Sequence, residues 1–288
     1  MRKTFTKTTA LLALLLLLIA PSLADTGSAQ NAFASFIRYS PTPGELDTSV
    51  VTFENSKGQQ VDLISAVHVA DGGYYKNLNN RFKNYDTVLY ELILPDDMAG
   101  QQLPAQMSSS SGVSGIQGML ARSLGLTTQL DRINYSPKNF KHADLTQSGL
   151  SQKMAERKES LATYLMQALM KSASMDEKQL GISEAELASI DLASVMSGTS
   201  SAKDRKVLKK LFASALSSSG GLLSAMSDSA IIAERNKVAL NVLDKQVQQG
   251  DRRMAIFFGA AHMPDMAQRL RKNGWKRTKT DWLTAWTI

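Results

Sequence analysis

The stretch Met254-Ala-Ile-Phe-Phe-Gly-Ala-Ala-His262-Met-Pro-Asp-Met266 decides the fold. Its first five residues are apolar and rich in β-formers, and they predict a fully buried strand. Three small residues precede His262, and Pro264 can occupy the first turn of a helix that continues to Lys272. A histidine is therefore expected at the carboxyl end of a buried strand, directly before a helix. In open α/β sheets this edge is where ligands bind.

A second stretch, Val61-Asp-Leu-Ile-Ser65-Ala-Val-His68-Val-Ala-Asp71, repeats this pattern much earlier in the chain. It again consists of an apolar strand, a small residue, two further apolar residues and a histidine. The chain contains three histidines, and two of them have this local context. We therefore expect the rest of the chain to be a scaffold that brings His68 and His262 together.

The N-terminal segment predicts export. A basic start precedes an apolar run from Ala10 to Ala20, and Ser22-Leu-Ala24 supplies the small residues that signal peptidase reads. We expect residues 1–24 to be a signal peptide of the general secretory route. The mature protein is then periplasmic or secreted and has no stable membrane span after cleavage, because the apolar run is too short for one.

The remaining residues, 25–288, are expected to form a single domain. The chain is 43% hydrophobic and 20% charged, which is ordinary for a globular protein, and without cysteine it must rely on its core. The formal charge of +7 falls to +4 because residues 1–24 contain three basic residues and no acid. This weak surplus indicates no nucleic-acid partner.

A basic cluster near the C-terminus could meet an anionic surface, although a solvated helix end and strand face is the simpler interpretation. Its members are Arg269, Arg271, Lys272, Lys276, Arg277 and Lys279.

The first part of the domain is predicted to be antiparallel. Strands are expected over Phe33–Tyr39 and Ser49–Phe53, and the hairpin turn Asn55-Ser-Lys-Gly58 leads into the strand that ends near His68. A helix should follow, from about Tyr74 to Lys83, because apolar residues recur there at helical spacing. The sheet is therefore expected to be mixed, with helices flanking it.

Glu91 stands out because it lies inside the apolar run from Asp86 to Leu94, which predicts another buried strand. A buried carboxylate is costly unless it is paired, hydrogen-bonded or bound to a metal. The alternative is that Glu91 faces solvent on a half-exposed strand. The three residues that follow Glu91 are all apolar, so the strand has little room for a face that is exposed to solvent.

The middle of the chain, about 100–228, predicts a helical insertion that caps the sheet. Amphipathic stripes of Leu, Met and Phe recur there at helical spacing, separated by Ser-rich stretches. The third histidine, His142, lies in a polar setting and is expected at the surface, and Asp144 is expected to cap a helix or to lie near the site.

A further helix is predicted from about Asp228 to Gln249, and it carries Arg235 and Asn236. Arg235 stands one turn after two isoleucines of the buried face, so it can reach the sheet. The alternative is a surface arginine that is paired with Glu234 or Asp244.

Together these residues resemble the TraB/PrgY/GumN family, whose animal members are the TIKI proteases. That family pairs two Gly-x-x-His motifs, with a glutamate on an early strand and an Arg-Asn on a helix between them. Gly259-Ala-Ala-His262, Val88-Leu-Tyr-Glu91 and Arg235-Asn236 match these motifs, whereas Ser65-Ala-Val-His68 has serine in place of the first glycine.

The resemblance implies a metal-dependent peptidase on an α/β fold shared with erythromycin-esterase-like and haem-binding ChaN-like proteins. Independently, two histidines and a carboxylate are a standard ligand set for a catalytic divalent metal with an open water position. We expect His68, His262 and Glu91 to be the metal ligands, with Glu91 alternatively the general base. Arg235 and Asn236 complete the expected catalytic set, with Arg235 stabilising an oxyanion. Manganese, cobalt and zinc all suit these ligands.

Two functions therefore fit the sequence. The first is an exported metal-dependent hydrolase of the TIKI type that acts on a peptide or protein substrate. The second is a non-catalytic protein that binds a peptide, a metal or haem in the same cleft, and the serine at position 65 keeps this alternative open. Nothing in the sequence indicates an oligomeric state.

Overall fold

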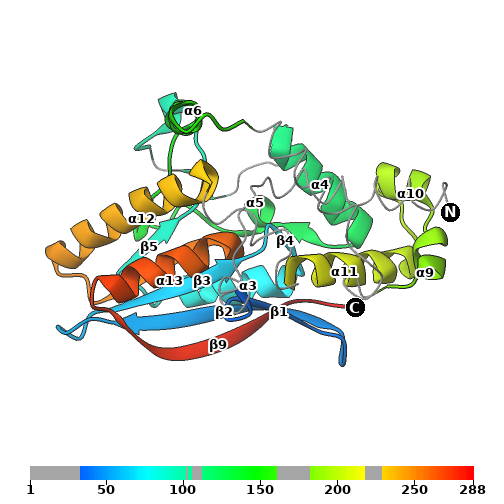
Figure 1. The fold of residues 1–288 in the computed structure, drawn as a ribbon, viewed down its shortest axis with the longest axis horizontal. Helices are drawn as coiled ribbons and strands as arrows, with labels where there is room; N and C mark the ends of the chain where they lie inside the picture. Colours follow the sequence, from blue (N-terminus) through cyan, green and yellow to red (C-terminus); the bar gives the residue numbers. More distant parts are fainter. Residues whose placement is uncertain (1–32, 102, 106–111, 161–181, 218–228) are drawn as a thin grey trace.

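The computed structural model describes residues 33–101, 103–105, 112–160, 182–217 and 229–288. The expected signal peptide lies outside these residues. In the described part, a seven-stranded mixed sheet is flanked by helices, as predicted (Figure 1). The order of six strands is β1-β2-β3-β8-β5-β7, and β9 pairs with β2. Their bounds are β1 Ile37–Ser40, β2 Glu45–Glu54, β3 Gln60–Ala66, β5 Thr87–Tyr90, β7 Phe140–His142, β8 Arg253–Gly259 and β9 Lys276–Thr287.

One half of the sheet is antiparallel, as the hairpin turn predicts. β2 pairs along one edge first with β1 and then with β3, and along its other edge with the whole of β9. The pairing with β9 shifts register between Leu46 and Asp47 and between Thr52 and Phe53. These irregularities let one long C-terminal strand follow the twist of β2.

The other half of the sheet is parallel. β8 lies between β3 and β5, and β7 follows β5, all in the same direction. The carboxyl ends of four strands therefore share one edge. The prediction that the strands leading to His68, Glu91 and His262 are neighbours in one sheet is confirmed.

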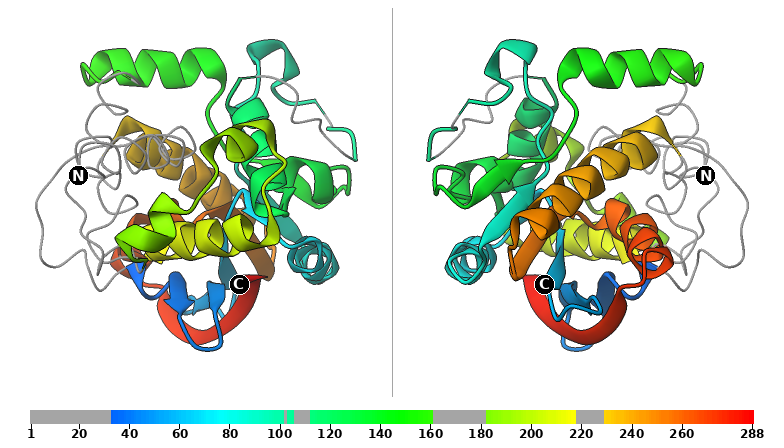
Figure 2. Two further views of the ribbon diagram at one scale, coloured as in Figure 1. Left: turned by 90° about the vertical axis from the view of Figure 1, so that its right-hand side faces the viewer. Right: turned by 90° about the vertical axis from the view of Figure 1, so that its left-hand side faces the viewer.

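The central strand β8 is buried on both faces, which explains its continuous apolar run. Ala255 and Phe257 belong to one hydrophobic core, together with residues of α3, Gly72–Phe82. Met254, Ile256 and Phe258 belong to a second core on the opposite face. There they pack with α12 (Ala230–Gln249) and α13 (Met263–Lys272), which lie across the sheet from α3 (Figure 2).

The middle of the chain is richer in structure than a helical insertion. Its described part is mainly helical, but β7 joins the main sheet, and β6 (Thr127–Thr128) pairs with β4 (Val69–Ala70) just after His68. The short helix η1 (Asp96–Met98) precedes this region. The helices are α4 Gly112–Leu124, α5 Gln129–Arg132, α6 Gln147–Glu156, α9 Glu184–Ala188, α10 Leu192–Ser197 and α11 Ala202–Ser217. Residues 161–181 and 218–228 of the predicted insertion lie outside the described part.

Helix α12 ends where its sequence predicts. Gly250 follows the last residue of the helix with φ +98°, and its N–H donates to the carbonyl of Gln246, as in a left-handed C-cap. Among the described helices, none has the length and apolar character needed to cross a membrane.

Candidate functional site

Four polar side chains follow the four parallel strands at their common carboxyl edge. His68 comes two residues after β3, Glu91 directly after β5, and Asp144 two residues after β7. His262 ends the short helix η3 (Ala260–His262) that follows β8. The site is therefore assembled at the edge that the sequence predicts for ligand binding.

Arg235 joins two of these residues in a buried ion cluster. Its Nη2 donates to Glu91 Oε1 at 2.7 Å and to Asp144 Oδ2 at 2.6 Å, and its Nε donates to Asp144 Oδ1 at 2.8 Å. The side chains of Arg235, Glu91 and Asp144 are 6%, 9% and 0% exposed. The alternative of a surface arginine is thereby excluded, as is the alternative of a solvent-facing Glu91.

The remaining nitrogen of Arg235 makes the weakest contacts. Nη1 lies 3.4 Å from the carbonyl oxygen of Ile231 and 3.4 Å from His262 Nε2. The fork is thus anchored through Nε and Nη2, whose hydrogen bonds are short. Because the guanidinium group is planar and rigid, Nη1 stays in place, and it is the nitrogen that can exchange its present acceptors for another at least cost.

Asn236 fixes the orientation and the tautomer of His262. Its Nδ2 donates to the His262 carbonyl oxygen at 3.1 Å and to Asp265 Oδ2 at 2.8 Å, so its Oδ1 must be the acceptor toward the ring. His262 Nδ1 lies 2.6 Å from this oxygen and therefore carries a proton that it donates. In the neutral ring, Nε2 is left with a lone pair, and it lies 3.4 Å from Glu91 Oε1. Metal-binding histidines are commonly oriented in this way.

Gly259 leaves the space in which the site residues meet. A Cβ built on this residue would lie 3.2 Å from Glu91 Oε2, 3.7 Å from His68 Nε2 and 3.9 Å from His262 Cδ2. Because both ring atoms lie within 4 Å of one point, the two imidazoles are close neighbours. The glycine is required for space and not for its backbone, since its φ of −54° suits any residue.

The backbone of Gly259 also binds Glu91, because its N–H donates to Oε2 at 2.5 Å. Burial alone would raise the pKa of the Glu91 carboxyl group, but the Arg235 guanidinium beside it holds this pKa well below its usual range. Burial likewise opposes the charge of Arg235, whereas Asp144 and Glu91 raise its pKa above the ordinary value. Both groups are therefore charged.

The donor set fits a divalent metal in chemistry and in charge. One guanidinium faces two carboxylates, so the buried cluster carries a net charge of −1 when both imidazoles are neutral. His262 Nε2, His68 Nε2 and the Glu91 carboxylate are nitrogen and oxygen donors of the kind such metals bind. In the described residues, however, no three His, Asp or Glu side chains form a metal-binding group as they stand. Arg235 occupies one Glu91 oxygen, and the Gly259 N–H occupies the other.

Asp144 lies in the site, which is one of its two predicted places, whereas Thr146 caps the following helix; the pairing of Asp144 with Arg235 is what the sequence does not reveal. The three-residue strand β7 that delivers it is too short to show strand periodicity. The one available signal is its position, since Asp144 follows β7 much as Glu91 follows β5.

Two other polar residues that the sequence singles out take different places. His142 is half-buried at the end of β7, where its Nε2–H donates to the Leu92 carbonyl oxygen at 2.6 Å, so it is not a free surface residue. Ser65 is fully buried in β3, and its hydroxyl has no hydrogen-bond partner in the described structure.

Comparisons of the chain with family models, with curated proteins and with solved structures found no match. The resemblance to the TraB/PrgY/GumN family therefore stays a prediction that rests on the sequence motifs.

Proposed function

We propose that the protein is an exported metal-dependent hydrolase that acts on peptides, with His68, His262 and Glu91 as the ligands of one divalent metal. The observation that carries this proposal is the state of His262. Its Nδ1–H is held by Asn236, and its Nε2, which keeps the free lone pair, lies 3.4 Å from Arg235 Nη1 and 3.4 Å from Glu91 Oε1, close to the ring of His68. Fixing one nitrogen so that the other can bind a metal is a common feature of metal-binding histidines.

In this proposal, each residue of the site has a separate role. His68, which is half-buried, and the space at Gly259 provide the approach to the site. A divalent metal such as manganese, cobalt or zinc would activate water and polarise the scissile carbonyl. Glu91 would serve as a ligand through the lone pairs that remain, because each of its oxygens accepts only one hydrogen bond in the described structure, from Arg235 or from the Gly259 N–H. Arg235 Nη1 would donate to the oxyanion, which replaces the two long contacts that Nη1 now makes.

The engagement of Arg235 also favours the second candidate function. All the nitrogens of Arg235 have acceptors within the protein. If these contacts are kept, Arg235 cannot stabilise an oxyanion, and the site would bind a peptide, a metal or haem without turnover. Catalysis, in contrast, requires Nη1 to become available.

Metal removal tests the proposed function directly. We expect the purified protein to hydrolyse members of a peptide library, to lose this activity after exhaustive chelation, and to regain it with manganese, cobalt or zinc. Metal analysis before and after chelation gives the amount bound. Hydrolysis that is unaffected by complete metal removal would exclude the metal mechanism. Metal or peptide binding without any hydrolysis would favour the binding protein.

A methyl group at position 259 should disable the site without unfolding the protein. Gly259→Ala places a Cβ 3.2 Å from Glu91 Oε2 and beside His68, so the carboxylate must move. A misplacement of about 1 Å can cost about a hundredfold in catalytic efficiency, and the shift needed here is smaller. We expect kcat/KM for peptide hydrolysis to fall, by less than about a hundredfold, while the far-ultraviolet circular dichroism is retained.

Gly73→Ala is the matched control, because a Cβ at Gly73 would meet nothing within 4 Å. It should keep full activity. Equal activity in the two variants would show that the space at Gly259 is not part of the site.

A further inference from the structure

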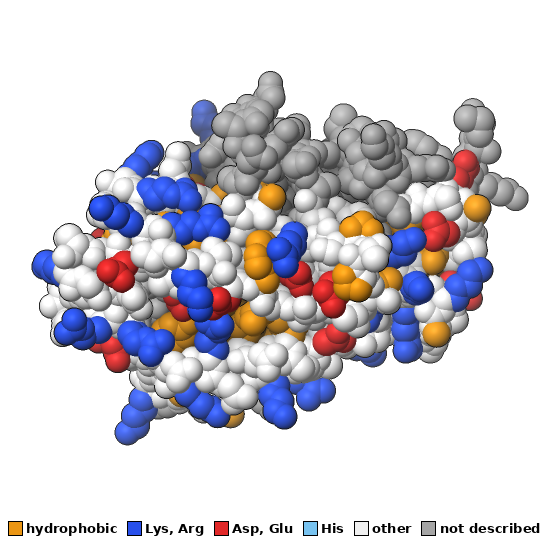
Figure 3. All heavy atoms as spheres, turned by 90° about the horizontal axis from the view of Figure 1, so that it is seen from below, with side chains coloured by type: hydrophobic (Ala, Val, Ile, Leu, Met, Phe, Trp, Pro, Cys, Tyr) orange, Lys and Arg blue, Asp and Glu red, His pale blue; other side chains and the backbone are white. Residues whose placement is uncertain are grey.

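Six exposed cationic side chains gather at the end of the molecule opposite the site. They come from the β2–β3 turn, the start of β8, the end of α13 and the start of β9. Strand pairing brings these segments together, because Glu54 pairs with both Gln60 and Lys276, and Gln60 pairs with Arg253. Figure 3 shows Lys and Arg side chains outnumbering acidic ones toward this end, on the left. These six residues form the cationic end of the molecule: Lys57, Arg252, Arg253, Lys272, Lys276 and Arg277.

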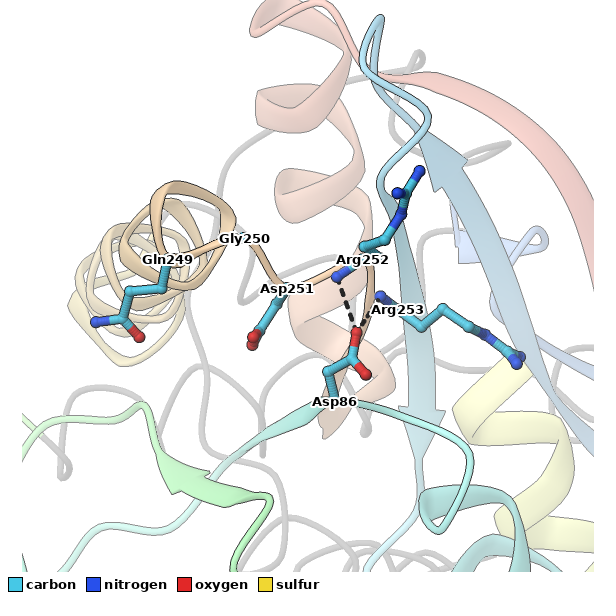
Figure 4. A pocket seen from close by; sticks show the side chains of 6 residues that line it. All are labelled: Asp86, Gln249, Gly250, Asp251, Arg252 and Arg253. Carbon is cyan, nitrogen blue, oxygen red and sulfur yellow. Dashed lines mark hydrogen bonds between the residues drawn. The ribbon is translucent and has the colours of Figure 1, made fainter.

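The carboxylates at this end are bound to uncharged donors. Asp86 accepts the backbone N–H groups of Arg252 and Arg253 at 2.8 and 2.9 Å, while the two guanidinium groups extend away from it in different directions (Figure 4). Asp251, which lines an open hollow together with Asp86, accepts from Thr87 Oγ1 at 2.6 Å. Glu54 accepts from the side-chain amide of Gln60.

The cations of this end therefore remain available to a partner. Within the described part of the chain, none of the six forms an ion pair with a carboxylate, whereas the nearby Arg269 and Lys279 do. Lys272, Lys276 and Arg277 are the members of the predicted C-terminal basic cluster that belong to the cationic end. The fold adds three cations from two distant segments to the same surface.

We propose that the cationic end seats the protein on an anionic phospholipid surface. Each Lys or Arg near such a surface raises affinity about fivefold, so six cations suffice for reversible binding. The cationic end offers charge without apolar anchors, since the one large hydrophobic side chain exposed in the described residues is Met196 on α10. This composition fits adsorption onto headgroups. Binding of single-stranded nucleic acid would also call for exposed aromatic side chains.

The orientation that follows leaves the site accessible. β3 and β8 both begin at the cationic end and finish at the site, and seven residues of parallel strand span about 20 Å. A protein held by its cationic end would therefore present the His68 and His262 edge away from the lipid. This docking does not depend on the proposed hydrolase activity.

Sedimentation with vesicles tests the proposal. We expect the mature protein to sediment with vesicles of equal parts phosphatidylglycerol and phosphatidylcholine, and not with vesicles of phosphatidylcholine alone. Binding should weaken steeply as salt is raised, because exposed charges are screened. Equal binding to both kinds of vesicle, or binding only to a soluble polyanion such as heparin, would overturn the proposal.

Two triple variants with the same net charge make the test specific to this surface. Lys272→Gln/Lys276→Gln/Arg277→Gln should lower vesicle affinity about a hundredfold, at about fivefold for each residue. Lys76→Gln/Lys203→Gln/Lys206→Gln removes three exposed lysines of α3 and α11 and should leave the affinity nearly unchanged. Equal losses in the two variants would show that net charge alone, and not the cationic end, binds the lipid. Peptide hydrolysis, measured in parallel, should be unchanged in both.

Discussion

Replacing His262 by alanine is expected to remove the bound metal and to lower kcat/KM for peptide hydrolysis more than about a hundredfold. Loss of an outer partner of a metal-binding histidine already costs roughly 10- to 100-fold in affinity or activity, so loss of the ligand itself should exceed this range. His262 is also the residue on which the proposed site converges, through Asn236, Glu91 and Arg235. The bound metal is measured by metal analysis of the purified variant, and kcat/KM is measured by steady-state kinetics.

His142→Ala is the matched control. His142 lies at the same edge of the sheet, but its ring donates to the Leu92 carbonyl oxygen and packs against Tyr90. Losing this hydrogen bond should lower the unfolding free energy by about 1 kcal/mol and leave the metal and the activity in place. Full activity in His262→Ala would rule out the metal site, even if the protein binds metal elsewhere.

Replacing Asp144 by alanine should lower the free energy of unfolding by about 3–5 kcal/mol, because it leaves part of a buried guanidinium group without its acceptor. Asp144 is fully buried and receives two short hydrogen bonds from Arg235. Urea denaturation, followed by circular dichroism, gives the difference. Asp281→Ala serves as the control, since its pairs with Arg81 and Lys279 are partly exposed and should contribute less than about 1 kcal/mol.

The same cluster can be used to separate stability from function. Replacing all three charges together, as in Glu91→Leu/Asp144→Leu/Arg235→Met, should restore most of the stability, because an apolar set of similar volume avoids the desolvation cost. This triple variant should nevertheless be inactive. A small loss in Asp144→Ala, similar to that of Asp281→Ala, would contradict the buried ion cluster. An active triple variant would contradict its role in the site.

Much of the fold can be predicted because its signals are local. The apolar run of β8, the hairpin turn before β3 and the left-handed cap at Gly250 each follow from a few neighbouring residues. The hydrophobic pattern also predicts that β3, β5 and β8, three of the four parallel strands, are neighbours. Each of these strands is a short apolar run that leads to a polar residue of the site. The fourth, β7, escapes prediction because three half-buried residues carry no periodicity.

The candidate site is predictable in its residues but not in its connections. A carboxylate in an apolar strand, an arginine near the buried face of a helix and two histidines in like contexts each depart from the expected pattern of burial. Their sequence positions suggest a ligand set. They do not indicate that Asp144 holds the fork of Arg235, or that Asn236 binds both the ring and the carbonyl group of His262.

By itself, therefore, the sequence determined which segments are buried, where the strands end and which polar residues stand at those ends. These properties depend on hydrophobic periodicity and turn chemistry, which act over a few residues. Only the tertiary structure decided that Arg235 lies between two carboxylates, that Gly259 leaves room for the imidazoles, and that Lys57 and Arg253 join the C-terminal cations. These depend on side-chain direction and strand register between residues far apart in the chain, where a shift of one position would turn every side chain to the opposite face.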